Sequence, residues 1–379
     1  MEKSKQSLKI CIVTPLFALS GVPLAQVRFA RALSNAGHDV DLVIGKIDSQ
    51  YKLPDVGGAR LCNLHKPDVK SMFFPLVRYI HGTTPDIIFS AEDHLNAIVL
   101  LAALTTRSKT KISCSSRVTP FDTYSNSLFT KRWVLKQVMR AVMWRADALT
   151  CVSKDMVKQY KQVFESPNHL CVYNIVDDRH SRKNLLEHVD DDWFANKQQP
   201  LLVAAGQLAP WKGFGDLIRA MDRLGPSIQA RLVIFGDGPL KAELQELIDG
   251  LHLSTKVRLF GYVENPLKYF SRADVFVLSS HVEGLPNVLV EAMMCGCTPV
   301  ATDCPTGPRE VLQDGKYGYL VPVADPAALA SGIEQALNSP IPKDLLSEAI
   351  RPFSEHAVIQ RHFEVLGISS TSTVDNEKP

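Results

Sequence analysis

Residues 9–44 read KICIVTPLFALSGVPLAQVRFARALSNAGHDVDLVI, and this stretch decides the fold. It opens with a β-branched apolar run, repeats apolar side chains at helical spacing over 22–35, and returns to a β-branched run at 40–44. A strand, a helix and a second strand in this order predict a βαβ unit. Such units build a parallel sheet with helices on both faces.

The same alternation runs through the rest of the chain, with one interruption. The interruption is the polar stretch DDRHSRKNLLEHVDDDWFANKQQ at 177–199. At 379 residues the chain is long enough for two domains. We therefore predict an α/β protein with two Rossmann-like, doubly wound domains. Further strands and helices are expected at 86–90, 110–113, 148–152, 170–173, 201–205, 230–235, 240–251, 256–259, 274–278, 287–294 and 298–301.

The pattern suggests five parts. We expect a first domain over 1–185, a linker over 186–199, a second domain over 200–350, a C-terminal helix over 351–368 and a disordered polar tail over 369–379. After Asp325, which suits a helix cap, the segment DPAALASGIEQAL has helical spacing.

Composition argues against several classes of protein. Lys and Arg total 42 against 40 for Asp and Glu, so the near-neutral charge gives no case for nucleic acid. The eight cysteines lack paired or zinc-site spacing, which favours reduced thiols and no metal site. No apolar run approaches the roughly 18 residues of a membrane span. Pro15 interrupts the apolar stretch near the N-terminus, which otherwise imitates a signal peptide. We expect a cytoplasmic protein, at most peripheral to a membrane.

Positive charge is concentrated in the first half, where residues 101–161 hold 12 basic and 3 acidic residues. Within it, 130–148 reads TKRWVLKQVMRAVMWRADA, an amphipathic helical pattern. One interpretation is that its basic face meets anionic lipid, and the other is an ordinary helix with a solvated basic face. The apolar side chains in question are Trp133, Val134, Val138, Val142 and Met143, and the basic ones are Lys131, Arg132, Lys136 and Arg140.

Residues 281–300, HVEGLPNVLVEAMMCGCTPV, contain the most informative side chains. Glu283 and Glu291 lie in an otherwise apolar run, where an unpartnered carboxylate costs several kcal/mol to bury. Each therefore needs a polar partner, either a ligand or a local salt bridge. The intervening GLPN resembles the start of a helix, and amides at a helix start bind phosphate.

Other candidates follow predicted strands, where open α/β sheets bind their ligands. Gly21 lets a ligand approach the backbone, although a tight turn explains it equally well. Lys212 stands in AAGQLAPWKGFGDLIRA, either to neutralise a diphosphate or as a solvated charge. Backbone near Val263 could contact a nucleobase edge. Arg309 either meets a ligand or pairs with a nearby carboxylate.

The spacing of Glu283 and Glu291 around GLPNVLVEAM, together with GQLAPWKG, FGDGP and SGVPLAQVRFARALSNAGHDV, resembles glycosyltransferase family 4. These are retaining, group 1 enzymes of the two-Rossmann type called GT-B. The resemblance runs from about residue 9 to 366, and CPTGPREVL is similar to bacterial enzymes of lipopolysaccharide, capsule or lipid-linked oligosaccharide synthesis. It implies that the helix over 351–368 packs back on the first domain, which would bind the acceptor.

The resemblance also implies roles for single residues. Glu291 would bind the ribose hydroxyls, Lys212 the diphosphate, and Glu283 would lie by the transferred sugar, with Lys212 and Glu283 as the catalytic pair. Positive charge on the leaving diphosphate would make a metal or other cofactor unnecessary. The residues expected around the nucleotide sugar are Gly21, Gly206, Gln207, Val263, Gly284, Leu285, Pro286, Asn287, Val288 and Glu291.

Two positions depart from the family pattern. Many relatives have Arg where Gln207 stands, so Arg117 or Arg309 would have to compensate on the phosphates. Many also have a first-domain His close to the sugar, where this chain offers Arg117 in SSRVTP, with His94 as a substitute.

The predicted function is transfer of a hexose or N-acetylhexosamine, with retention, from a UDP-sugar to a glycan or lipid-linked glycan in surface polysaccharide synthesis. The alternatives are a sugar-nucleotide epimerase or hydrolase of the same fold, and a catalytically silent nucleotide-sugar-binding subunit. Turnover only with an added glycan distinguishes the first from the others.

Overall fold

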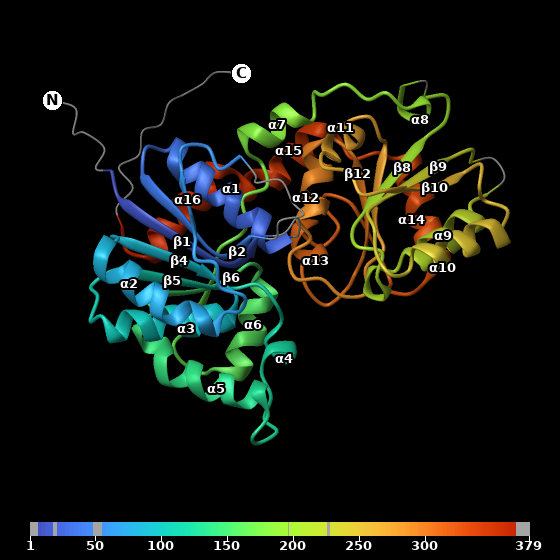
Figure 1. Cartoon of the computed structure of the whole chain (residues 1–379). Helices are drawn as coiled ribbons and strands as arrows, with labels where there is room; N and C mark the ends of the chain where they lie inside the picture. The colour runs from blue at the N-terminus through green and yellow to red at the C-terminus, as the bar shows by residue number, and fades with distance from the viewer. Residues whose placement is uncertain (1–6, 18–20, 48–54, 196, 226–227, 369–379) are drawn as a thin grey trace. The chain divides into compact units, whose positions relative to one another are not determined.

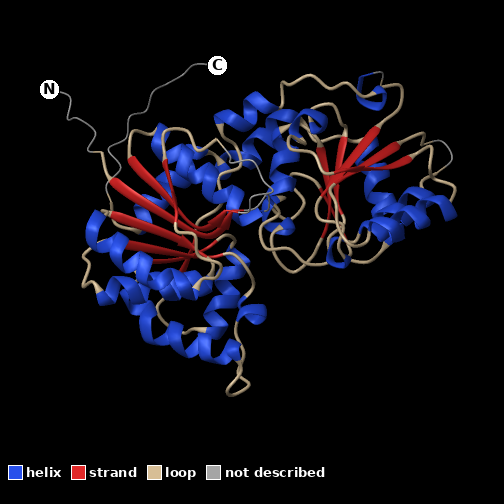
Figure 2. Ribbon diagram, in the orientation of Figure 1, coloured by secondary structure: helices blue, strands red, loops and turns tan. Residues whose placement is uncertain are grey.

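The computed structural model describes residues 7–17, 21–47, 55–195, 197–225 and 228–368. The chain forms two compact units, one of residues 1–175 together with 355–379 and the other of residues 176–354. Each unit is a parallel sheet between layers of helices, as Figure 2 shows, so the predicted α/β class is confirmed. Among the described residues, no helix is both long enough and apolar enough to span a bilayer.

The first unit contains a seven-stranded parallel sheet of order β3-β2-β1-β4-β5-β6-β7 (Figure 1). Its strands are β1 Lys9–Phe17, β2 Asp39–Ile47, β3 Arg60–Asn63, β4 Ile87–Ala91, β5 Lys111–Ser116, β6 Ala148–Cys151 and β7 His169–Cys171. Its helices are α1 Gly21–Asn35, η1 Lys70–Met72, α2 Phe73–Thr83, α3 Asp93–Thr105, α4 Pro120–Thr123, α5 Lys131–Val142, η2 Met143–Arg145, α6 Lys154–Val163 and α16 Glu355–Val365.

The C-terminal helix α16 completes the core of this first unit. Val358, Phe363 and Leu366 are buried in the same cluster as the strand residues Ile10 and Ile12. The His362 ring packs against Phe29, with centroids 4.6 Å apart, and burial lowers the pKa of His362 to about 3. His362, which is more than 300 residues away in sequence, thus packs directly against α1.

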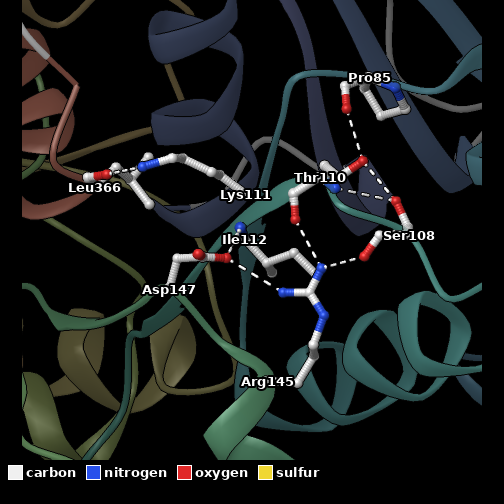
Figure 3. A network of polar contacts seen from close by, with 8 residues as sticks. All are labelled: Pro85, Ser108, Thr110, Lys111, Ile112, Arg145, Asp147 and Leu366. Atoms are coloured by element: carbon white, nitrogen blue, oxygen red, sulfur yellow. Dashed lines mark hydrogen bonds and ion pairs between the residues drawn. The ribbon is translucent and has the colours of Figure 1, made fainter.

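Arg145 ties together the turns at the amino end of β5, as Figure 3 shows. Its guanidinium donates to the carbonyl oxygens of Ser108 at 2.7 Å and Thr110 at 2.8 Å, and it pairs with Asp147 at 3.2 Å. Beside this network, the Lys111 ammonium donates to the Leu366 carbonyl that follows α16 (Figure 3). The network joins three segments distant in sequence.

Arg145→Ala is expected to lower the free energy of unfolding by about 2 kcal/mol, because two carbonyl oxygens lose a charged donor. Urea unfolding monitored by circular dichroism measures the change. The exposed Lys109 in the same turn is the matched control, and Lys109→Ala should fall within about 0.5 kcal/mol of the wild type. Equal losses in the two variants would contradict a specific role for the Arg145 contacts.

The second unit repeats the architecture with a six-stranded parallel sheet of order β10-β9-β8-β11-β12-β13. Its strands are β8 Leu201–Ala205, β9 Arg231–Phe235, β10 Val257–Gly261, β11 Val275–Leu278, β12 Thr298–Thr302 and β13 Tyr319–Val321. Its helices are α7 Arg179–Asn184, α8 Asp192–Ala195, η3 Pro210–Lys212, α9 Phe214–Arg223, α10 Lys241–Gly250, α11 Leu267–Phe270, α12 Asn287–Met294, α13 Pro308–Val311, α14 Pro326–Asn338, α15 Lys343–Ile350 and η4 Arg351–Phe353. Asp325 caps α14, as predicted, by accepting from the amides of Ala327 and Ala328.

The structure corrects the expected boundaries. The first unit ends at residue 175 rather than 185, and 186–199 is part of the second unit instead of a free linker. The guanidinium groups of Arg231 and Arg258 both stack on the Trp193 ring, 4.8 and 4.1 Å from its centroid. Asp191 pairs with Arg258 at 2.7 Å. Arginines on β9 and β10 thus hold the segment around Asp191 and Trp193 against the second sheet, although its composition is polar. The predicted disordered tail lies outside the described residues.

Candidate active site

Strand order in the second sheet identifies where a ligand can bind. The chain reverses direction across the sheet between β8 and β11, and the crevice at such a reversal is the usual ligand site of doubly wound folds. Lys212 ends the short helix η3 that follows β8, and Glu283 lies in the loop that follows β11. The two strongest candidates from the sequence therefore come from the two strands that flank the reversal.

Lys212 and Glu283 form an ion pair, with 2.5 Å between Nζ and Oε1. Their side chains are 18% and 10% exposed, so each supplies the counter-charge that the other requires. The hydroxyl of Ser280 donates to the same Glu283 oxygen at 2.6 Å, and the Thr306 hydroxyl donates to the Glu283 carbonyl. The polar partner predicted for Glu283 is thus the lysine expected to bind phosphate.

Three further contacts join the two loops that carry the pair. The Ser279 hydroxyl donates to the Lys212 carbonyl at 2.9 Å, and the His281 amide donates to the Trp211 carbonyl at 2.8 Å. The His281 ring and the Asp216 carboxylate share a hydrogen bond of 2.7 Å between Nε2 and Oδ2. Hydrogen bonds between the two segments therefore hold the backbones that carry Lys212 and Glu283 in place.

Glycines allow the backbones of these loops to approach closely. Gly213 has φ of +62°, and a Cβ there would lie 2.0 Å from the Ser279 carbonyl oxygen. Gly236, at the end of β9, has φ of +132°, and its Cβ would lie 1.9 Å from the carbonyl oxygen of Gly206. A side chain at either position would force adjacent strand ends apart.

Glu291 lies on α12, which begins at Asn287 directly after Pro286. Both Asn287 and Glu291 are half-buried, and their spacing of four places them on one face of the helix. At this entry the amides of Asn287 and Leu289 donate to the carbonyls of Leu285 and Pro286, each at 2.9 Å, whereas the Val288 amide donates to no described residue. A free amide at a helix start suits an anion. Gly307, with φ of +93°, packs its Cα against this entry, where a Cβ would lie 2.5 Å from the Gly284 carbonyl oxygen. The other predicted residues of this entry, Leu285 and Val288, are half-buried.

The remaining second-unit candidates are distributed around the same sheet edge. Gly206 and Gln207 follow β8, and Gln207 is exposed. Val263 follows β10 and is half-buried. The Arg309 guanidinium forms ion pairs with Asp303 and Asp314, so of the two interpretations given for Arg309, the structure shows the pairing with nearby carboxylates.

In the first unit, the candidates gather at the carboxyl end of the sheet. Gly21 opens α1, and a Cβ on it would meet no atom of the described residues within 4 Å. His94 is exposed on the first turn of α3. Arg117 follows β5, and its guanidinium donates to Asn174.

Sequence reasoning missed the residues that hold the Lys212–Glu283 pair. Thr306 and Asp216 lie within the motifs CPTGPREVL and AAGQLAPWKGFGDLIRA, but nothing in those motifs assigned them a role, and neither Ser280 nor His281 was predicted to hold the pair. The signal in the sequence that could have identified them is a hydroxyl-bearing or ionisable residue close to the end of a predicted strand. Among the described residues, no group of three or more His, Cys, Asp or Glu side chains is placed to hold a metal ion.

Comparison with family models gives two matches. Residues 187–352 match the model described as glycosyl transferases group 1, and residues 20–174 match that of the glycosyl transferase 4-like domain. Each match covers most of one structural unit, and the first contains the entire Lys212–Glu283 site.

Named relatives cover most of the chain. An N-acetylgalactosamine-N,N'-diacetylbacillosaminyl-diphospho-undecaprenol 4-alpha-N-acetylgalactosaminyltransferase of Campylobacter jejuni is 32% identical in an alignment that covers 79% of this chain and 82% of that protein. The amylovoran biosynthesis glycosyltransferase AmsD of Erwinia amylovora is 29% identical over 75% of this chain and 78% of its own length.

Solved structures show the same fold at lower identity. The Anabaena protein Alr3699/HepE, in complex with UDP, superposes with a TM-score of 0.75 and 19% identity, covering 95% of this chain and all of that one. Sucrose-phosphate synthase from Thermosynechococcus elongatus gives a TM-score of 0.70 and 19% identity, over 94% of this chain and 97% of that one. The fold is therefore GT-B, and the chain belongs to the group 1 glycosyl transferases, the family that its sequence resembles.

Proposed function

We propose that this glycosyltransferase moves a hexose or N-acetylhexosamine, with retention, from a UDP-sugar to a glycan or lipid-linked glycan acceptor in surface polysaccharide synthesis. The observation that carries the proposal is the meeting of Lys212 and Glu283 at the reversal point of the second sheet. Support for the donor comes from HepE, which binds UDP in its solved structure, and support for the acceptor comes from the Campylobacter enzyme named for a diphospho-undecaprenol glycan.

The hydrogen-bonding capacity of the pair fits a diphosphate and a sugar together. An ammonium has three donors, so Lys212 can keep its bond to Glu283 and still offer two N–H groups to phosphate oxygens. Glu283 Oε1 accepts from Lys212 and Ser280, whereas Oε2 accepts no hydrogen bond from the described residues. That second oxygen is available to sugar hydroxyls and to the positive charge that develops at the anomeric carbon.

In this scheme the leaving diphosphate is stabilised by Lys212 and by the Val288 amide at the start of α12, without a metal or other cofactor. Glu291 on the same helix accepts the ribose hydroxyls. Retention follows from attack on the face that the phosphate leaves, with the departing phosphate oxygen taking the proton of the acceptor hydroxyl. The first unit binds the acceptor.

Glu291→Ala is expected to weaken binding of UDP-sugar about 100-fold, because two hydrogen bonds to a charged group are lost. A panel of nucleotide sugars screened by mass spectrometry identifies the donor, and calorimetry then measures its affinity for the variant. Glu246→Ala, on the exposed face of α10, is the matched control and should bind as the wild type does. Undiminished affinity in Glu291→Ala would contradict the ribose assignment. Turnover of the donor without acceptor would favour a hydrolase.

The first unit also carries a surface suited to an anionic membrane, which would bring the protein to a lipid-linked acceptor. The loop before α5 projects from the unit (Figure 1), and its Leu128 and Phe129 are 64% and 86% exposed. The exposed Lys131 and Arg140 lie on α5, which follows that loop. Only part of the predicted helix face is available, since Val142 and Met143 are in the core and Lys136 is buried against Asn126.

Phe129→Ser is expected to reduce flotation with vesicles containing phosphatidylglycerol by at least about 5-fold, since an exposed aromatic ring no longer enters the interface. Phe74→Ser, 78% exposed on α2, is the matched control and should float as the wild type does. Wild-type flotation that is absent, or insensitive to salt, would contradict the membrane surface.

A further inference from the structure

A carboxylate with no assigned role lies at the reversal point of the first sheet. In that sheet the chain reverses between β1 and β4, as it does between β8 and β11 in the second. Glu92 follows β4 directly and precedes α3. It therefore stands at the carboxyl end of the strand that corresponds in order to β11, after which Glu283 lies.

The backbone of Glu92 is strained. Its φ of +81° and ψ of 132° lie in a region that side-chain-bearing residues rarely occupy. Such a conformation costs about 1–3 kcal/mol and persists only where the surroundings impose it. Here the Glu92 amide donates to the Ser115 carbonyl at 3.0 Å, and its carbonyl accepts from the Asn96 amide at 2.9 Å. A position that needed only a turn would be better served by glycine.

A buried network beneath Glu92 holds the neighbouring segment. The Asp93 carboxylate accepts from the Ser116 hydroxyl at 2.6 Å and from the Tyr160 hydroxyl at 2.5 Å. Tyr160 also approaches the Val118 carbonyl at 3.2 Å. These contacts fix the residues on both sides of Arg117, so the same network places Glu92 and Arg117.

Arg117 and Glu92 offer complementary hydrogen-bonding groups. The Arg117 guanidinium donates to Asn174, while its buried Nε has no partner among the described residues. Burial lowers the pKa of Arg117 to about 10. Burial likewise raises the pKa of Glu92, and the charge of Arg117 opposes that rise. The Glu92 carboxylate, which is half-buried, accepts no hydrogen bond from the described residues.

These charges select the chemistry of a ligand. Because the two groups carry opposite charges, the pair as a whole favours neither an anion nor a cation, whereas a neutral polyhydroxyl group can donate to Glu92 and accept from Arg117. We propose that Glu92 and Arg117 form a subsite for the acceptor sugar, in which Glu92 accepts a hydrogen bond from an acceptor hydroxyl and Arg117 donates to a neighbouring oxygen. The inference rests on the proposed function, in which the first unit binds the acceptor.

Saturation-transfer NMR with methyl α-glucoside, methyl α-galactoside and the methyl N-acetyl-α-hexosaminides tests the subsite without requiring transfer. At least one glycoside should bind the wild type, and Glu92→Gln should weaken that binding at least about 10-fold while UDP binding stays unchanged. Glu364→Gln, at an exposed position of α16, is the control and should match the wild type. Absence of glycoside binding to the wild type, or equal binding by Glu92→Gln, would overturn the proposal.

A second variant separates a binding role from a structural one. Glu92→Gly removes both the carboxylate and the strain, so it should lose glycoside binding and melt about 2 °C or more above the wild type. A lower melting temperature would mean that the side chain holds the fold, and would overturn the proposal. Glycoside binding that depends on Glu92, without transfer from any nucleotide sugar, would refute the proposed function and leave the subsite standing.

Discussion

Lys212→Met is expected to lower kcat about 1,000-fold, because under the proposed function the leaving diphosphate loses the ammonium assigned to it, and Glu283 loses its counter-charge. The melting temperature should also fall, since a carboxylate that is 10% exposed is left without its partner. Steady-state kinetics with the identified donor and calorimetric scanning measure the two effects. Lys256→Met, an exposed change in the same unit, is the matched control for both.

The double variant Lys212→Met with Glu283→Gln distinguishes the two losses. Its melting temperature should recover toward the wild type, because no uncompensated charge remains, whereas kcat should stay as low as in the worse single variant. Simple additivity of the two changes in kcat would show that Lys212 and Glu283 do not act as a unit.

Gly213→Ala is expected to lower the free energy of unfolding by about 3 kcal/mol or more and to abolish most turnover. The physical reason is twofold: φ is +62°, and the new Cβ would lie 2.0 Å from the Ser279 carbonyl oxygen. The loops that bring Lys212 to Glu283 would have to separate. Urea unfolding measures the loss of stability, and steady-state kinetics with the identified donor measure the loss of turnover.

Gly250 offers the contrasting substitution. It ends α10, and a Cβ there would meet no atom of the described residues within 4 Å. Gly250→Ala should therefore leave unfolding within about 1 kcal/mol of the wild type. A loss of stability as large as that of Gly213→Ala would mean that an added methyl group is harmful wherever it is placed. It would then contradict the explanation that Gly213→Ala acts through the close approach of Gly213 to Ser279.

Most of the fold was predictable because its buried strands are short, largely apolar runs such as residues 201–205 and 231–235, separated by helical repeats. Strand β3, Arg60–Asn63, was missed because its residues RLCN are mixed in character and only partly buried. The segment 186–199 was predicted to be a linker because its composition is mostly polar. Its polar composition hid Trp193, whose ring is held by two arginines from strands that composition alone does not bring near.

The site was predictable as separate residues and not as an arrangement. Lys212 and Glu283 were both identified at strand ends, yet they were assigned to different parts of the ligand. Their contact depends on β8 and β11 being neighbours, and 71 residues separate the two side chains along the chain. Glu92 was missed because its backbone strain is a property of the fold, and a glutamate after a strand has no signature in sequence.

The position of α16 has a consequence for the order in which the protein is made. Residues 1–175 are synthesised first, but their core lacks Val358, Phe363 and Leu366 until the last part of the chain emerges. Residues 176–354 contain all of their own strands and can close earlier. On the ribosome the first unit to be translated is therefore the last to be completed, and its unfinished surface stays exposed while residues 176–354 are made.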